Sequence, residues 1–231
     1  MKKSFQTGFI ISMIFMCTNV FGQTNGTGLS NGKKVEKTPK TYLDLMVNVV
    51  STNLNYGAAN YEMANYKKSS NGIQAGASFQ AGITPGFSLV SEIYFMRKGG
   101  KLKADNPLSA KQSNIRLNTI ELPVLARFHF GKFYMNAGPS IAYNISGNRE
   151  IDDLSTKLPF ENSNEGFKRF DAGVQIGGGF EFPFKQRRIA VDIRYNYGLT
   201  NLVYSKEMYN RTLMISVHFS KAWKTNPLSR K

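Results

Sequence analysis

Residues 166–194 read GFKRFDAGVQIGGGFEFPFKQRRIAVDIR, and two long alternating patterns fill this stretch. From Phe170 to Phe182 the even positions are apolar or glycine, and the odd positions are polar or glycine. A sustained period of two predicts a β-strand with one apolar and one polar face. The alternation resumes at Ile189 and runs to Tyr197. Strands of soluble sandwiches usually have about five or six residues, whereas a tilted strand that crosses a bilayer needs roughly nine to eleven. The length of these two strands therefore predicts a membrane barrel.

The same alternation recurs along the chain and predicts eight strands in all. We expect them at residues 41–51, 72–83, 87–97, 114–130, 133–145, 170–182, 189–197 and 210–220. Short turns are expected at residues 84–86, 131–132 and 183–186, and long polar loops at residues 52–71, 98–113, 146–165 and 200–209. Outer-membrane barrels have an even number of antiparallel strands, short periplasmic turns and longer extracellular loops. We therefore predict an all-β fold: an eight-stranded antiparallel up-and-down transmembrane β-barrel with four long extracellular loops, three short periplasmic turns and both termini in the periplasm.

Two local features qualify this prediction. Pro123 lies inside an expected strand, although proline cannot donate to a strand ladder, so we expect a β-bulge there. Aromatic residues gather where two membrane-interface girdles are expected. The predicted periplasmic girdle is Phe87, Phe130, Phe133, Phe182 and Phe219, and the predicted outer girdle is Phe95, Tyr143, Phe170 and Tyr197.

The N-terminus is typical of an exported protein. Lys2 and Lys3 precede an apolar run of about ten residues, which is too short to span a membrane, and Gly22 offers a small residue for cleavage. We predict a signal peptide at 1–22, a flexible periplasmic leader at 23–40, the barrel at 41–220 and a basic periplasmic tail at 221–231. The single cysteine, Cys17, lies in the predicted signal peptide, so the mature chain has no disulfide.

The formal net charge is +15, which raises the possibility of a nucleic-acid partner. The lysines and arginines, however, gather in connections and ends and not on one face. Three such groups are Lys33, Lys34, Lys37 and Lys40; Lys98, Lys101, Lys103 and Lys111; and Lys221, Lys224, Arg230 and Lys231. Export also separates the chain from nucleic acid. The expected anionic partners are outer-membrane lipids, including phosphorylated lipopolysaccharide.

A soluble eight-stranded barrel of the lipocalin kind shares the period, the size and the export of this chain. Its polar face would meet water and should be rich in lysine and glutamate. Here the polar face consists mainly of glycine, serine, asparagine and glutamine. Such a face suits a packed barrel interior, so the pattern favours the membrane barrel and a location in the outer membrane.

One region resembles a known family. Residues 120–128, IELPVLARF, are followed by FYMNAGP at residues 133–139, and together they resemble the outer membrane β-barrel family of PorT-like proteins of Gram-negative bacteria. Residues 87–99 and 170–182 are similar to the flanking segments of that family. The resemblance extends over about residues 40–220. It implies an eight-stranded outer-membrane barrel, and the namesake of the family takes part in type IX protein secretion.

The polar faces of the predicted strands carry charges that we expect inside the barrel. An eight-stranded barrel is just wide enough for side chains to fill it, and charges buried there must pair. The candidates are Asp44 and a predicted lumen charge network of Glu92, Glu121, Arg127, Asp171, Glu181, Asp192 and Arg194. Glu92, Glu121 and Arg127 lie on two neighbouring predicted strands. Asp171, Glu181, Asp192 and Arg194 lie on another two neighbouring strands. The main interpretation is a salt-bridge network that plugs the lumen, and the alternative is a relay or gate.

The sequence offers little for catalysis or cofactors. The chain has two histidines, His129 and His218, both expected near periplasmic strand ends, and Ser216 beside His218 has no evident acid partner. No spacing indicates a metal site, and residues 177–179, all glycine, lack the context of a phosphate-binding loop and instead indicate close packing or strand curvature. We therefore expect no enzyme activity and no cofactor. The predicted role is structural or partner docking, and the alternatives are a narrow channel for small solutes or an accessory of a type IX-like secretion system.

Overall fold

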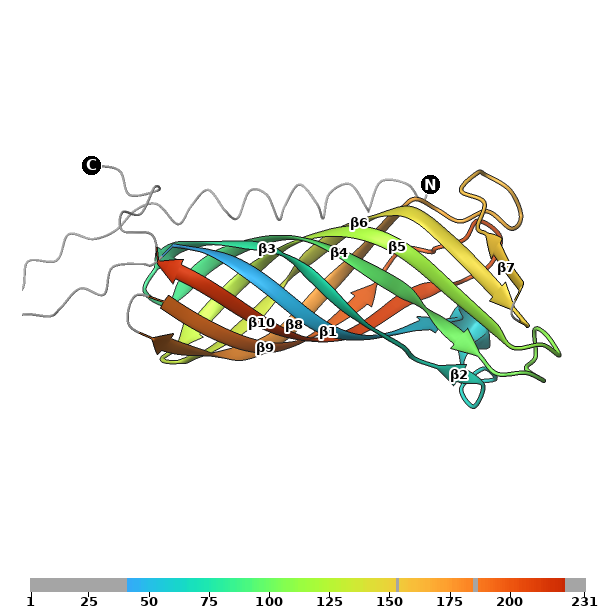
Figure 1. Ribbon diagram of the computed structural model, residues 1–231, viewed down its shortest axis with the longest axis horizontal. Coiled ribbons are helices and arrows are strands. Elements are labelled where there is room, and N and C mark those ends of the chain that lie inside the picture. The colour runs from blue at the N-terminus through green and yellow to red at the C-terminus, as the bar shows by residue number, and fades with distance from the viewer. Residues whose placement is uncertain (1–40, 153, 185–186, 223–231) are drawn as a thin grey trace, which may run out of the picture. The chain divides into compact units, whose positions relative to one another are not determined.

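The computed structural model describes residues 41–152, 154–184 and 187–222, and these residues form a closed antiparallel barrel (Figure 1). The eight long strands are β1 (Tyr42–Asn55), β3 (Ser70–Thr84), β4 (Phe87–Leu102), β5 (Ser113–Phe130), β6 (Phe133–Ile151), β8 (Phe170–Phe184), β9 (Arg187–Gly198) and β10 (Tyr209–Ala222). Each long strand pairs with the next one along the chain, and β1 pairs with β10 to close the ring. The predicted fold class is confirmed. The predicted signal peptide, leader and most of the predicted tail lie outside the described residues.

The two ends of the barrel differ in the length of their connections. At one end, called the turn end here, Pro85 and Gly86 join β3 to β4, and Gly131 and Lys132 join β5 to β6. Gly131 has φ 71°, a conformation that glycine adopts without strain. Tyr42 pairs with Ala222 at this same end, so the described chain enters and leaves the barrel beside the short turns. These features agree with the predicted short-turn pattern. The third short connection includes residues 185–186, which are not described.

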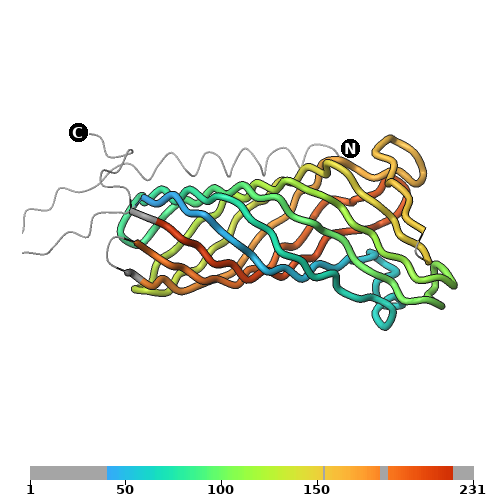
Figure 2. Tube along the Cα trace, viewed as in Figure 1, coloured from blue at the N-terminus to red at the C-terminus, as the bar shows by residue number. Residues whose placement is uncertain are grey.

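The opposite end, called the loop end here, carries the long connections (Figure 2). Three short elements lie in them: a 3-10 helix η2 (Gly57–Asn60), strand β2 (Lys67–Lys68), which pairs with β4, and strand β7 (Leu154–Lys157), which pairs with β6. Figure 2 shows the strands running obliquely around the barrel and extending into this end.

The predicted loop boundaries are wrong at the loop end, because several strands continue past them. Strand β4 extends to Leu102, so Lys98 and Lys101 belong to a strand and not to the predicted loop 98–113. Strand β6 extends to Ile151 inside the predicted loop 146–165, and β7 adds a hairpin there. The apolar alternation stops at Phe95 because residues beyond the bilayer no longer need an apolar outward face. The strands themselves do not stop there.

Pro123 lies in β5 without the predicted bulge. The register between β5 and β6 is the same on both sides of it, with Pro123 opposite Ser140 and Ala126 opposite Ala137. The irregularity on this pair of strands falls instead between Asn118 and Thr119. The ladder therefore tolerates the missing donor of Pro123 without inserting a residue.

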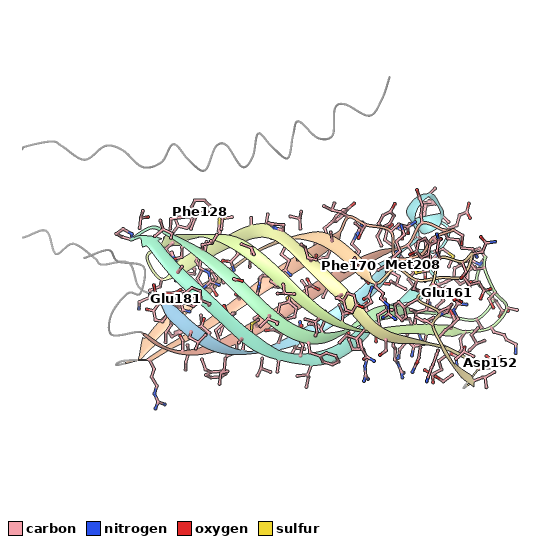
Figure 3. All side chains as sticks on the ribbon, turned by 90° about the horizontal axis from the view of Figure 1, so that it is seen from above. Phe128, Asp152, Glu161, Phe170, Glu181 and Met208 are labelled. Atoms are coloured by element: carbon pink, nitrogen blue, oxygen red, sulfur yellow. The ribbon has the colours of Figure 1, made fainter. Side chains whose placement is uncertain are left out.

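The barrel has its apolar side chains outside and its polar side chains inside. Large hydrophobic residues are exposed along every long strand, among them Leu45, Ile73, Phe128 and Ile176, and we call this outward surface the apolar belt. Along β1 and β9 every second residue is buried, and the buried ones include Asp44, Asn48, Asp192 and Arg194. A lipocalin-like barrel has the opposite arrangement, so the soluble alternative is excluded. Figure 3 shows side chains of both kinds, with Phe128 and Glu181 toward the turn end and Met208 toward the loop end.

Aromatic residues lie near both edges of the apolar belt. At the turn end, the ring centroids of Phe133 and Phe180 are 4.7 Å apart and those of Phe180 and Phe182 are 4.5 Å apart. Toward the loop end, Tyr143 and Phe170 stack edge-to-face with centroids 5.2 Å apart. Amphipathic and aromatic side chains at these two levels are typical of the two interfaces of a bilayer.

Candidate functional site in the barrel lumen

Charged and polar side chains fill the barrel interior. Arg127 and Arg194 are among the largest fully buried side chains of the described residues. An unpaired charge at such a place would cost several kcal/mol, so its partners decide whether the fold is stable. Three clusters of partners follow one another from the turn end to the loop end, and each joins strands that are not neighbours in the sheet.

The middle cluster is built around Arg194. Its Nη1 donates to Glu92 Oε2 at 2.7 Å, and its Nε donates to Asp192 Oδ1 at 3.0 Å. Asp192 and Arg194 are two residues apart on β9 and therefore share the inner face. Glu92 reaches the same guanidinium from β4, across the lumen. Ser216 on β10 accepts a further hydrogen bond from Arg194 Nη2 at 3.1 Å.

The cluster at the turn end contains two arginines that share one amide oxygen. Gln80 Oε1 accepts from Arg127 Nη1 at 2.7 Å and from Arg188 Nη1 at 2.8 Å. Arg188 also pairs with Asp44 at 2.6 Å and with Glu181 at 2.7 Å. The nearest carboxylate oxygen of Glu181 is 3.9 Å from Arg127 Nη1. Five side chains from different strands are thereby tied into one network.

Aromatic rings cover the two arginines of this cluster. The Arg127 guanidinium lies 4.1 Å from the centroid of the Tyr134 ring, and Arg188 lies 3.8 Å from that of Tyr42. Stacking of this kind adds a cation–π attraction that strengthens when water is excluded. Tyr134 also donates its hydroxyl to Asp192 Oδ2 at 3.0 Å, which links the turn-end and middle clusters.

The cluster nearest the loop end is built around Glu121. Its Oε1 accepts from Asn196 at 2.6 Å and from Gln175 at 2.8 Å, and its Oε2 is ion-paired with Lys98. Lys98 lies 3.6 Å from Asp171 as well. The ammonium group of Lys98 therefore lies at ion-pair distance from two carboxylates, that of Glu121 on β5 and that of Asp171 on β8.

All seven residues of the predicted network face the lumen. As expected, Glu92 lies on β4 beside β5, which carries Glu121 and Arg127. The ion partners were not predicted: Glu92 pairs with Arg194 across the barrel, and Glu121 pairs with Lys98. Asp192 and Arg194, two residues apart on β9, pair with each other. The alternation along each strand indicated which residues face inward, but it did not indicate which of them pair across the lumen.

Two lumen cations were missed from the sequence, although each had a signal. Arg188 has the same parity as the inward residues of its strand, since positions 188, 190, 192 and 194 alternate together on β9. Lys98 likewise continues the inward series of Glu92 and Tyr94, and its side chain is 2% exposed. Lys98 was missed because the strand was expected to end at Arg97.

The structure corrects the expectation that His218 has no acid partner. Its Nε2 lies 3.3 Å from Asp192 Oδ2, and its Nδ1 lies 3.6 Å from Asp44 Oδ2. His218 and Ser216 are both fully buried, however. The other histidine, His129, lies near the turn end with Ser88 Oγ 2.9 Å from its Nε2.

A hydrophobic cluster closes the loop end of the lumen, and we call it the apolar cap. It consists of Leu54, Tyr56, Met63, Leu102, Ile115, Leu117, Leu158, Phe167, Leu202, Val203 and Met208. These residues come from strand ends and from three of the four long connections. Burial raises the pKa of Tyr56, which lies beyond the apolar belt, to about 12, so its hydroxyl is neutral at physiological pH. The lumen is thus filled by charge pairs along most of its length and by apolar contacts at the loop end.

Within the described part of the chain, no group of three or more His, Cys, Asp or Glu side chains is arranged to hold a metal ion. No helix in that part of the chain has the length and hydropathy needed to cross a membrane.

Solved structures with some likeness to this chain include several small barrels. The outer membrane protein OprG of Pseudomonas aeruginosa is 12% identical with a TM-score of 0.47, and the match covers 82% of this chain and 98% of OprG. Ail, the attachment invasion locus protein of Yersinia pestis, is 10% identical with a TM-score of 0.43, over 78% of this chain and 99% of Ail. Among curated proteins, none matches the chain significantly in sequence.

The family comparison covers much more of the sequence than any single motif. The family described as outer membrane protein beta-barrel domain matches residues 23–204, which is most of the chain. The closed eight-stranded barrel, its apolar belt and its polar lumen agree with that match. The protein therefore belongs to the family of outer membrane protein beta-barrel domains and is an outer membrane β-barrel protein.

Proposed function

We propose that this protein has a structural or partner-docking role in the outer membrane, and that its lumen does not conduct solutes. The observation that carries the proposal is the position of Arg127 and Arg194, whose buried guanidinium groups tie together strands on different sides of the lumen. The apolar cap above them adds a second closure. Because Ser216 and His218 are also inaccessible, the same packing supports a non-enzymatic role.

Reconstitution into planar lipid bilayers tests this proposal against the channel alternative. We expect no stable single-channel steps from the unmodified protein, because ions cannot pass without breaking the Arg194–Glu92 and Arg188–Asp44 pairs. The comparison variant replaces both arginines by alanine, which removes two of the largest lumen side chains and should allow intermittent conductance if the variant folds. Steady, reproducible steps from the unmodified barrel would establish a channel and remove the plug interpretation.

A partner of the outer surface is supported by cations that follow the apolar belt directly. Arg97 comes two residues after outward-facing Phe95 on β4, and Arg169 immediately precedes Phe170 at the start of β8. Arg211 occupies the corresponding place on β10. Within the described residues, none of these three arginines has a carboxylate oxygen at ion-pair distance. We infer that they bind the phosphate groups of outer-membrane lipids such as lipopolysaccharide.

Aromatic contacts hold two of these arginines at the level of the membrane interface. The Arg211 guanidinium lies 3.5 Å from the centroid of the Tyr197 ring, and Arg169 lies 4.7 Å from that of Phe160. A guanidinium fixed in this way is well placed to form paired hydrogen bonds with a phosphate.

Replacing Arg97, Arg169 and Arg211 together by glutamine should weaken the binding of phosphorylated lipopolysaccharide. Each basic residue near an anionic surface contributes about 1 kcal/mol, so the triple variant should bind roughly a hundredfold more weakly in native mass spectrometry. Arg187→Gln is the matched control, because this exposed arginine lies at the turn end. Equal lipid retention by the triple variant and the control would contradict the proposed contact.

The resemblance of residues 120–139 to PorT-like proteins supports a protein partner of the cell envelope, including a type IX-like secretion system, as a second candidate role. The structure supports docking at the loop end, where β2, β7 and η2 add surface beyond the barrel. Deleting the gene and comparing the exported proteome tests the secretion role. Unchanged export would remove it and leave the structural role in place.

We also propose that the mature protein begins at Gln23, after removal of a signal peptide. The family match begins at the same residue, which supports this boundary. Intact-mass measurement of the protein purified from outer membranes tests it directly. Retention of residues 1–22 would contradict it.

A further inference from the structure

A cavity of about 650 Å³ lies at the loop end, on the outer side of the apolar cap. All four long connections contribute to its walls, and Met208, labelled in Figure 3, is one of the residues that line it. Tyr56, Leu102, Ile115 and Val203 belong both to the cap and to the lining of the cavity. Its size falls in the range of about 300–1,000 Å³ that is usual for small-molecule sites.

The lining of this cavity is mainly apolar. Five cap residues form buried contacts beneath it, and Leu108 and Ile151 add further apolar surface. The cap also separates the cavity from the lumen pair of Lys98 and Glu121. A molecule that enters from outside therefore meets hydrocarbon and aromatic groups, and does not meet the charged network.

One half-buried cation is exceptional among these apolar groups. Arg149 lies near the end of β6 and lines the cavity. Its guanidinium is 6.0 Å from the centroid of the fully buried Phe167 ring, and its charge acts on the hydroxyl of Tyr56. Among the described residues, no carboxylate oxygen lies at ion-pair distance from Arg149; the adjacent Glu150 pairs with Arg116 at 3.2 Å.

The acidic residues of the cavity do not neutralise Arg149. Glu207 instead accepts a hydrogen bond from the backbone nitrogen of Ala58 at 3.0 Å, which fixes the loop before β10 against η2. Glu165 and Lys206 lie in exposed parts of the lining. A partly desolvated guanidinium that lacks an internal partner favours an anionic group from a ligand, because charge-assisted hydrogen bonds strengthen as water is excluded.

We propose that this cavity binds a small amphipathic carboxylate, with its apolar body on the cap residues and its carboxylate on Arg149. The apolar floor accounts for the body of the ligand, and the half-buried guanidinium of Arg149 accounts for its charge. A neutral apolar molecule would use only the floor. A multiply charged anion would place a second charge on the apolar wall of the cavity. The neutral molecule and the multiply charged anion are therefore both expected to bind more weakly than a monocarboxylate.

Methionine-methyl NMR of the barrel in lipid nanodiscs can test the proposal with naphthoate as the probe. Three methionines act as reporters of place: Met208 lines the cavity, Met135 faces lipid with 56% exposure, and Met46 is buried in the lumen. We expect naphthoate to shift the Met208 signal saturably and to leave Met46 and Met135 unchanged. The Met208 signal is assigned with Met208→Leu.

The same titration distinguishes the role of Arg149 from simple apolar binding. In Arg149→Gln, naphthoate should bind about tenfold or more weakly, as expected for the loss of a charge-assisted contact, and Arg149→Lys should be intermediate. Lys157→Gln is the matched control, because Lys157 on β7 is exposed and does not line the cavity. Naphthamide, the neutral analogue, should bind the unmodified protein as weakly as naphthoate binds Arg149→Gln.

Two results would overturn the proposal. A non-saturable shift at Met135 without a shift at Met208 would indicate partition into the bilayer only. Equal affinities for naphthoate and naphthamide on the unmodified protein would remove the role of Arg149, and this comparison stands even if a variant fails to fold. A saturable Met208 shift that favours the carboxylate supports the site.

Discussion

Replacing Arg194 by methionine is expected to destabilise the folded barrel by about 3–5 kcal/mol, because it leaves buried carboxylates without their cation. Glu92 would lose its 2.7 Å partner entirely, and Asp192 would lose one at 3.0 Å. Methionine has a similar length, so the loss of packing is small. Urea unfolding in lipid vesicles, followed by the heat-dependent shift in electrophoretic mobility, measures the change.

A second substitution separates the loss of charge pairing from other effects of the variant. Adding Glu92→Gln to Arg194→Met removes the unpaired carboxylate and should recover a large part of the lost stability, since Asp192 keeps contacts with Tyr134 and His218. Arg187→Met serves as the control, because Arg187 is exposed and should change stability little. A loss below about 1 kcal/mol in the single variant would mean that the network contributes little to folding.

The bilayer explains why the number and order of the strands could be predicted from the sequence. Lipid requires an apolar outward residue at every second position, so Phe170 to Phe182 and Ile189 to Tyr197 carry a strong periodic signal. The requirement ends where the barrel leaves the membrane. Strand β4 therefore continues through Lys98 and Lys101 without that signal, and the predicted loop began too early.

The pairing inside the lumen could be predicted only in part, for a geometric reason. Parity along a strand indicates that a residue faces inward, and it placed Glu92, Glu121 and Asp192 correctly. Which charges meet depends on the tilt and stagger of the strands, which bring Glu92 of β4 to Arg194 of β9. The apolar cap was not predicted at all, because its residues are single apolar side chains scattered over strand ends and three loops and have no common period.

The glycine run at residues 177–179 has a specific packing role, and it leads to the second large expected effect. Gly177 faces the lumen beside Arg194, its pair partner on β9. A Cβ atom at Gly177 would lie 2.8 Å from Arg194 Cα and 2.5 Å from Arg194 Cγ, and it would also collide with the carbonyl oxygen of Ile193. The close packing predicted for this run is thus confirmed at Gly177, where the missing side chain makes room for the stem of Arg194.

Gly177→Ala should therefore cost about 3 kcal/mol of folding free energy, at the upper end of the usual penalty for overpacking. Backbone atoms cannot move away without separating β8 from β9, and a moved Arg194 would lose Glu92. Gly72→Ala is the matched control on β3, because the nearest atom to its added Cβ is Val50 Cγ2 at an ordinary 3.7 Å. That control should be neutral or slightly stabilising, since alanine orders a strand at lower entropic cost than glycine. Comparable unfolding midpoints for the two variants in urea would show that the space beside Arg194 is not tightly fixed.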